Sequence, residues 1–300
     1  MKHQERIVVT GSLGFIGSAF LDSLPTGVEV LSLDRQSPRL KRQKSDQIRH
    51  HICDYSQLTA DDRARIQDFL PTSWLHAGWT GLPDYSLKTC LENTKSTLEF
   101  LQFLLTIGVK KHLILGSCWE YGDAKGLCTE DHPPLSPINL FASNKWGLFH
   151  MANSLCESAQ AHLIWPIVFF VYGKGQRPNS LIPMLLESFK NDKPIVLRTP
   201  YAVSDFIYIK DVATALWAFV NTQNISGRFN ISTGVGTRAH EVQELVSKLY
   251  AKSTIDSTMT SESQSVQGFW GDNSKVKKVT SWAPQYSLEA GIRDMLSPNI

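Results

Sequence analysis

The 300-residue sequence has little that would support a disulfide framework, a membrane span or a metal centre. Its five cysteines are scattered and odd in number, with no CxxC pair, so we expect reduced thiols, no structural disulfides and no bound metal. No apolar run reaches spanning length, and an apolar β-type segment begins almost at the N-terminus, which leaves no room for a signal peptide. We therefore expect a cytoplasmic protein without membrane contact.

An excess of charge of one sign is also lacking. The chain has 30 Lys+Arg and 28 Asp+Glu, a formal net charge of +2 at pH 7, which gives no electrostatic case for nucleic acid. One basic cluster, at Arg39, Lys41, Arg42 and Lys44, is interpreted as a solvated loop. At 42% hydrophobic and 19% charged residues, the composition is that of an ordinary globular protein of one large domain or two smaller ones.

A glycine-rich turn follows the first apolar segment. Residues 7–10 form a short β-branched run, and GSLGFIG at 11–17 leads into apolar residues at helical spacing. Glycines at this spacing allow a tight turn, close approach of the backbone to a pyrophosphate and close packing of helix on strand. The N–H groups at the helix start then face the phosphates. The residues of this turn expected at a dinucleotide are Gly11, Leu13, Gly14, Phe15, Ile16 and Gly17.

An acidic residue ends the next apolar segment. Asp34 follows the alternating stretch 28–33, at about the distance where a carboxylate accepts hydrogen bonds from the adenosine ribose. Its charge would repel a 2′-phosphate and so favours NAD, whereas the adjacent Arg35 could attract one and leaves NADP open.

Strand and helix patterns then alternate up to about residue 165, which predicts an α/β fold: a Rossmann-type doubly wound parallel sheet. The later pattern is irregular and predicts a smaller C-terminal substrate-binding lobe. We expect 1–165 to form the cofactor-binding domain and 166–300 to form mainly the lobe, with 166–173 and 205–234 returning to the first domain. A short strand is expected at 195–197, and the Ser/Thr-rich stretch 254–267 is expected to be a loop with a short edge strand.

Several motifs together resemble the extended short-chain dehydrogenase/reductase family, specifically its NAD-dependent nucleotide-sugar epimerases, dehydratases and 4-ketoreductases. The likeness covers nearly the whole chain, and the motifs are GSLGFIG at 11–17, LHAGWTG at 75–81, GSCWEYG at 116–122, YGKGQ at 172–176, SDFIYIKDVA at 204–213 and FNISTG at 229–234. The resemblance implies an NAD cofactor and a nucleotide-linked sugar as substrate. It also implies a homodimer that pairs the helix in 84–107 and the helix after Lys145 with their copies.

The resemblance also assigns binding residues. Further cofactor contacts are implied at Asp54, Tyr55, His76, Ala77, Gly78, Asn93, Lys145, Val168 and Phe169. Substrate contacts are implied at Thr80, Cys118, Trp119, Phe170, Ser180 and Leu181, and candidate phosphate partners are Arg177, Arg198 and Arg238. Forked guanidinium groups suit phosphate oxygens, although each arginine could equally be an ordinary surface residue. His76 could likewise be a satisfied core histidine.

The catalytic positions implied by the resemblance are Ser117, Phe141 and Lys145. Ser117 matches the Ser/Thr that hydrogen-bonds the sugar oxygen, and Lys145 matches the lysine that grips the nicotinamide ribose. Phe141 stands one helical turn before Lys145, where the family has its proton-transferring tyrosine. A positioned general acid or base is worth about 10²–10⁴ in rate, so the chain as written should be severely impaired.

Several interpretations stay open. GSCWEYG, AGWTGLPDYS at 77–86 and the strand at Trp165 look most like bacterial surface-polysaccharide enzymes that reduce 4-keto-6-deoxy nucleotide sugars, with a 4-epimerase as the alternative. Cys118 and Trp119 lack the acidic pair of some dehydratases, which argues against 4,6-dehydration, and Glu120 is expected to point away from the site. Phe141 could be an engineered replacement for tyrosine, or the chain could be a natural non-catalytic NAD-binding sensor or scaffold.

Overall fold

The computed structural model describes residues 5–36, 47–132, 139–193, 195–250 and 267–297. The basic cluster at 39–44 and nearly all of 254–267 lie outside the described residues. The first half contains β1 (Arg6–Thr10), α1 (Phe15–Ser23), β2 (Glu29–Asp34), β3 (Ile48–Ile52), α2 (Ala60–Asp68), β4 (Ser73–His76), α3 (Leu87–Thr106), β5 (Lys111–Ile114), β6 (Gly116–Ser117), the 3₁₀ turn η1 (Cys118–Tyr121), β7 (Gly126–Cys128) and α4 (Leu140–Ser158).

The second half contributes β8 and β12 to the main sheet and most of the smaller lobe. It contains β8 (His162–Val168), β9 (Phe170–Tyr172), α5 (Leu181–Lys190), β10 (Ala202–Ser204), β11 (Phe206–Tyr208), α6 (Ile209–Asn221), β12 (Gly227–Ile231), β13 (Thr237–Arg238), α7 (Ala239–Leu249), β14 (Gln267–Gly271), α8 (Ser274–Thr280) and α9 (Leu288–Leu296).

The main sheet is parallel and has the order β12-β8-β5-β4-β1-β2-β3, with β6 added beside β8. Thr10, at the end of β1, lies opposite Leu33 on one side and His76 on the other. The strand order reverses direction between β1 and β4, so the loops after these two strands frame the crevice where such sheets bind ligands. The expected Rossmann-type fold is confirmed.

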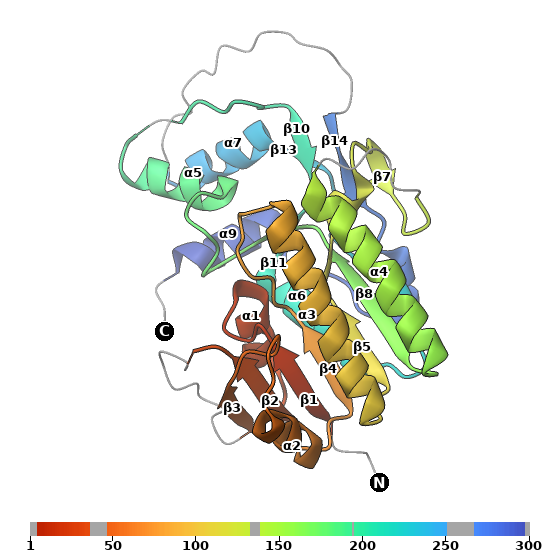
Figure 1. Ribbon diagram of the computed structural model, residues 1–300. Helices are drawn as coiled ribbons and strands as arrows, with labels where there is room; N and C mark the ends of the chain where they lie inside the picture. The colour runs from red at the N-terminus through yellow and green to blue at the C-terminus, as the bar shows by residue number, and fades with distance from the viewer. Residues whose placement is uncertain (1–4, 37–46, 133–138, 194, 251–266, 298–300) are drawn as a thin grey trace.

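Helices cover the sheet, and this explains why its strands are apolar along their length. Figure 1 shows α3 and α4 side by side in front of the sheet and α6 behind it, where α6 packs against α1. Ile7, Val8 and Val9 of β1 are completely buried, as expected for a strand covered on both faces.

The smaller lobe lies at one end of the main sheet. It contains the four-stranded sheet β13-β10-β14-β7, with α5 and α7 packed together beside it (Figure 1). The separate pair β11-β9 contacts α6, the helix behind the main sheet. The strand expected at 195–197 is wrong: Val196 is 78% exposed, and the carbonyl of Ile195 accepts a hydrogen bond from the Gln243 side chain at 2.9 Å. This segment is hydrogen-bonded to α7 and is not paired with a strand.

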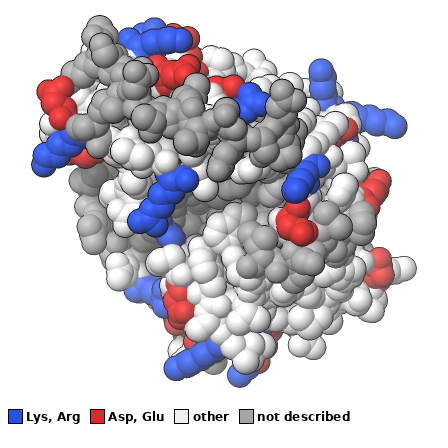
Figure 2. All heavy atoms as spheres, turned by 90° about the horizontal axis from the view of Figure 1, so that it is seen from above, with Lys and Arg blue, Asp and Glu red and all other residues white. Residues whose placement is uncertain are grey.

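The described surface carries charges of both signs, and the cysteines lie inside the protein. In the view of Figure 2, acidic and basic side chains are interspersed on the described surface. All five cysteines are buried and unpaired. None of the helices in the described ranges combines the length and the apolar character needed to cross a bilayer.

Candidate functional site

The loops after β1 and β4 meet at two glycines. Gly11 has a φ of +77°, and a Cβ added to it would lie 2.5 Å from the Cα of Gly78. A Cβ on Gly17 would lie 2.2 Å from the carbonyl oxygen of Gly11, so α1 can approach the turn only because residue 17 is glycine. Gly14 precedes α1 and offers no capping side chain, which leaves the first N–H groups of the helix for an anionic ligand.

The carboxylate of Asp34 is held at the end of β2 by neighbouring donors. It accepts hydrogen bonds from the Ser12 hydroxyl, from the Ser32 hydroxyl at 2.6 Å and from the backbone N–H of Leu13 at 3.3 Å. These contacts fix the carboxylate beside the glycine turn. There it can accept hydrogen bonds from the two hydroxyls of an unphosphorylated ribose.

A pocket of about 460 Å³ lies beside these groups. Its lining includes most of the glycine turn and the loop after β4, with three residues expected at the substrate: Gly11, Gly14, Phe15, Ile16, Asp34, Arg35, Tyr55, Ala77, Gly78, Thr80, Arg177 and Ser180. The structure therefore brings together residues that are far apart in the sequence, as the fold requires.

Other lining residues were not expected from the sequence: Leu33, Cys53, Trp79, Leu82, Val171 and Gln176. Most of them adjoin residues that were expected, so proximity along the chain could have found them. Trp79 and Leu82 lie within the motif at 77–86, and Gln176 ends YGKGQ.

A second, polar pocket of about 420 Å³ shares Arg35, Tyr55 and Thr80 with the first, and Asp54 and Asn93 line it. The Asn93 side chain has a structural task there. Its oxygen accepts a hydrogen bond from the Thr80 N–H at 2.8 Å, and its nitrogen donates to the Thr80 carbonyl at 3.0 Å. Asn93 therefore fastens the loop after β4 to α3.

Several residues expected at the cofactor line neither of the two pockets. His76 is buried between the hydroxyls of Thr10 and Thr97, at 2.8 and 3.2 Å, and burial lowers its pKa to about 3. It is a satisfied core histidine. The side chains of Val168 and Phe169 belong to the hydrophobic core, Leu13 is partly exposed, and Gly17 serves the packing of α1.

Lys145 connects α4 to the pocket wall. Its Nζ donates a hydrogen bond to the carbonyl of Leu115 at 2.8 Å and lies 4.4 Å from the centroid of the Trp79 ring, which lines the pocket. Burial lowers the pKa of Lys145 to about 8, and the charge of Glu120 opposes this shift. Lys145 is thus buried at the border of the first pocket.

Phe141 lies in an aromatic cluster with Trp79, Tyr85 and Trp119. The centroid of its ring is 4.9 Å from that of Trp79, 5.4 Å from that of Tyr85 and 5.9 Å from that of Trp119. Phe141 is buried, and it offers no hydroxyl to this part of the site. The ring of a tyrosine at this position would fit, and its oxygen would extend beyond the ring.

Glu120 fixes the segment that carries Ser117. Its carboxylate accepts hydrogen bonds from the Ser117 N–H at 2.7 Å and from the Trp165 indole N–H at 3.1 Å, and it pairs with the Arg228 guanidinium at 3.4 Å. Burial raises the pKa of Glu120, while Arg228 opposes the shift. Glu120 therefore points into the protein, as the sequence indicated. The Ser117 hydroxyl accepts a hydrogen bond from the Trp119 N–H at 3.3 Å.

The remaining residues expected at the substrate are dispersed. Cys118 is in the hydrophobic core, and Phe170 packs against Phe206 and Phe269. Leu181 packs against the second core cluster. Arg198 and Arg238 are exposed, and Arg238 pairs with Glu241 at the start of α7.

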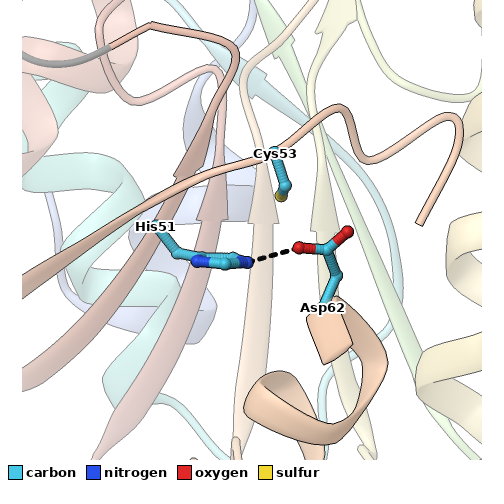
Figure 3. A group of neighbouring side chains, drawn as sticks. All are labelled: His51, Cys53 and Asp62. Atoms are coloured by element: carbon cyan, nitrogen blue, oxygen red, sulfur yellow. Dashed lines mark hydrogen bonds and ion pairs between the residues drawn. The ribbon is translucent and has the colours of Figure 1, made fainter. Parts of the chain in front are cut away.

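One group of side chains in the described residues has metal-ligand character: His51, Cys53 and Asp62 (Figure 3). The His51 Nε2 lies 2.6 Å from a carboxylate oxygen of Asp62, and the other oxygen of Asp62 accepts from the hydroxyl and N–H of Thr59. One carboxylate oxygen of Asp62 is thus occupied by the contact with β3, and the other by the residue that caps α2. Burial raises the pKa of the Cys53 thiol to about 12, so the protein alone does not favour a thiolate ligand.

The chain is similar to enzymes that act on nucleotide-linked sugars. UDP-glucuronate 4-epimerase from Thermodesulfobacterium geofontis is 25% identical over 205 residues, which are 67% of this chain and 62% of that protein. dTDP-4-dehydro-6-deoxyglucose reductase from Escherichia coli is 22% identical over 97% of this chain and 96% of its own length.

Solved structures show the same fold. UDP-glucose 4-epimerase from Thermotoga maritima has a TM-score of 0.82, with 22% identity and coverage of 97% of both chains. UDP-glucuronic acid 4-epimerase from Bacillus cereus in complex with NAD has a TM-score of 0.81, with 20% identity and coverage of 97% of this chain and 95% of that one. The NAD dependent epimerase/dehydratase family matches residues 7–232, which include the glycine turn, Asp34, Ser117 and Lys145. The chain belongs to this NAD-dependent family.

Proposed function

We propose that this protein binds NAD and a nucleotide-linked sugar and catalyses oxidation or reduction at C4, with a 4-keto-6-deoxy sugar nucleotide of surface-polysaccharide synthesis as the substrate class. The position of Trp79 is the main support for this proposal, because its ring connects the pocket with the two residues of α4 at the catalytic positions. It lines the cofactor pocket, and its ring contacts both Lys145 and Phe141. A sugar bound against this wall would therefore lie between the cofactor and the catalytic segment.

The residues present fit NAD. The glycines let the β1 and β4 loops pack backbone against backbone beside the uncapped start of α1, which suits a pyrophosphate, and the fixed Asp34 carboxylate suits an unphosphorylated ribose. When bound, NAD supplies the hydride chemistry. Lys145 would bind the nicotinamide ribose with its ammonium, and Ser117 would hold the sugar oxygen through its hydroxyl.

Phe141 determines the expected rate. Substitution Phe141→Tyr should raise turnover, because it restores a phenol one helical turn from Lys145; the gain reaches about 10²–10⁴ where no other group of the chain transfers the proton. The measurement is NADH absorbance with a panel of UDP- and dTDP-linked hexoses and 4-keto-6-deoxyhexoses. Phe103→Tyr, which adds a hydroxyl to the far part of α3, is the matched control and should change nothing.

A 4-epimerase is the second candidate, and the 4-epimerases among the relatives favour it. Product analysis distinguishes the two: an epimerase interconverts C4 epimers without net consumption of NADH, whereas a reductase consumes one NADH for each sugar. A non-catalytic sensor or scaffold is the third candidate, favoured by the missing hydroxyl at Phe141. Calorimetry that shows NAD binding but no sugar-nucleotide binding, with Phe141→Tyr inactive on the whole panel, would overturn the enzyme proposal.

We also propose that the chain forms a homodimer through α3 and α4. These adjacent helices expose four large apolar side chains: Leu87, Leu91, Leu140 and Met151. Their burial against a second copy would remove this apolar surface from water. Light scattering should give the mass of a dimer, and Leu91→Glu should shift it to that of the 33.7 kDa monomer.

A further inference from the structure

Tyr85 brings a second ring, which carries a phenol hydroxyl, into contact with Phe141. Its ring centroid lies 5.4 Å from that of Phe141 and 5.5 Å from that of Trp119, the residue two positions after Ser117. Tyr85 is half-buried and lies in the segment just before α3. It comes from a different part of the chain than the catalytic helix α4, so no pattern around Lys145 could reveal it.

The three fully buried tyrosines are engaged elsewhere. The Tyr121 hydroxyl donates to Asn230 at 2.6 Å, although Tyr121 belongs to the same motif as Ser117. The hydroxyl of Tyr172 donates to the Leu288 carbonyl at 3.2 Å, and that of Tyr208 donates to Asp294. Within the described residues, the Tyr85 hydroxyl makes no such bond and is not sealed off from solvent. It is therefore available to a ligand.

The backbone on both sides of Tyr85 is fixed. The Asp84 carboxylate accepts hydrogen bonds from the Ser86 N–H at 2.9 Å and from the Ser86 hydroxyl at 3.0 Å, and Ser86 caps α3. Asn93 clamps Thr80 earlier in the same segment. Tyr85 is thus carried on a segment whose backbone is held without the ligand, which favours efficient proton transfer.

We propose that Tyr85 is the proton donor and acceptor for the sugar oxygen in this chain, in place of the hydroxyl missing at Phe141. This inference rests on the proposed oxidoreductase function. In the reductive direction, the carbonyl carbon gains a hydride, the carbon–oxygen π electrons move to oxygen, and that oxygen takes the Tyr85 proton. The ketone is reduced to an alcohol, NADH is oxidised to NAD⁺, and solvent returns a proton to the Tyr85 phenolate.

The test compares single and double variants with the same sugar-nucleotide panel. Tyr85→Phe keeps the ring and should lower the turnover of the chain at least 10-fold, with the affinity for NAD and the thermal midpoint unchanged. Phe141→Tyr in the Tyr85→Phe background should restore turnover, because the second phenol makes the first dispensable. Tyr286→Phe, which removes a hydroxyl in the smaller core cluster, should leave turnover unchanged.

The outcomes separate this inference from the proposed function. Equal turnover in the unaltered chain and in Tyr85→Phe, whether measurable or absent, overturns the role of Tyr85. If Phe141→Tyr is then active, the proposed oxidoreductase function stands without Tyr85. If every variant is inactive and none binds a sugar nucleotide, both proposals fail.

Discussion

The buried carboxylate of Glu120 lies 3.4 Å from the guanidinium of Arg228, and both side chains are almost completely removed from water. Arg228 also donates to the Glu130 carbonyl at 2.9 Å and lies 4.2 Å from the centroid of the Trp146 ring. This ion pair connects β12 to the turn that holds Ser117. The turn that carries Ser117 is thus held in place by a buried charge pair.

Removal of the Glu120 charge should destabilise the whole domain. Glu120→Gln leaves Arg228 buried without its counter-charge, and breaking such a buried pair costs about 3–5 kcal/mol. Urea unfolding measures this loss. The control Glu289→Gln breaks an exposed pair with Arg293, at 2.7 Å, and should cost less than about 1 kcal/mol. Equal losses in the free energy of unfolding of the two variants would show that the buried pair stabilises the protein no more than the exposed one.

Asp34 should control the choice between NAD and NADP. Asp34→Ala removes charged hydrogen bonds to the ribose, each worth about 1.5–3 kcal/mol, so the dissociation constant of NAD should rise at least 10-fold. Binding of NADP should improve, because the repelling carboxylate is gone while Arg35 remains. Calorimetry with both cofactors gives the ratio. An unchanged preference for NAD would place the ribose away from Asp34.

The affinity for NAD should depend on pH through Lys145. Burial lowers the pKa of this lysine to about 8. Its amino group is therefore charged at a pH below about 8 and loses the charge as the pH rises through this value. A hydrogen bond from a charged donor is stronger than one from a neutral donor by about 1 kcal/mol, so NAD should bind several-fold more weakly above this pKa. Lys145→Met should bind weakly at both pH values. A pH dependence that persists in Lys145→Met would assign it to another group.

Gly17 should tolerate no side chain. Gly17→Ala places a Cβ 2.2 Å from the Gly11 carbonyl, so α1 must shift away from the turn and the dissociation constant of NAD should rise at least 10-fold. Gly147→Ala is the contrast, since nothing lies within 4 Å of its Cβ position in α4. That variant should gain about 0.5–1 kcal/mol of stability, because alanine is the better helix former. Full NAD binding by Gly17→Ala would contradict the close packing of α1.

Much of the cofactor half could be predicted because its signals are local. The Gly11–Gly17 turn, the buried strands and Asp34 each depend on spacing within one βαβ unit, and the structure places them as expected. The smaller lobe was harder to predict. Its strand β10 pairs with β13 and β14, which lie far along the chain, and the strand expected at 195–197 failed for lack of a partner.

The sequence by itself determined the family and its NAD cofactor, because both follow from the identity of residues within short motifs, and it shows a phenylalanine at residue 141. Only the tertiary structure decided that His76 is a core residue, that Glu120 is neutralised by Arg228, and that Tyr85 lies against Phe141. These relationships join segments from different strands and helices. Contacts of that kind depend on packing in three dimensions and leave no periodicity along the chain.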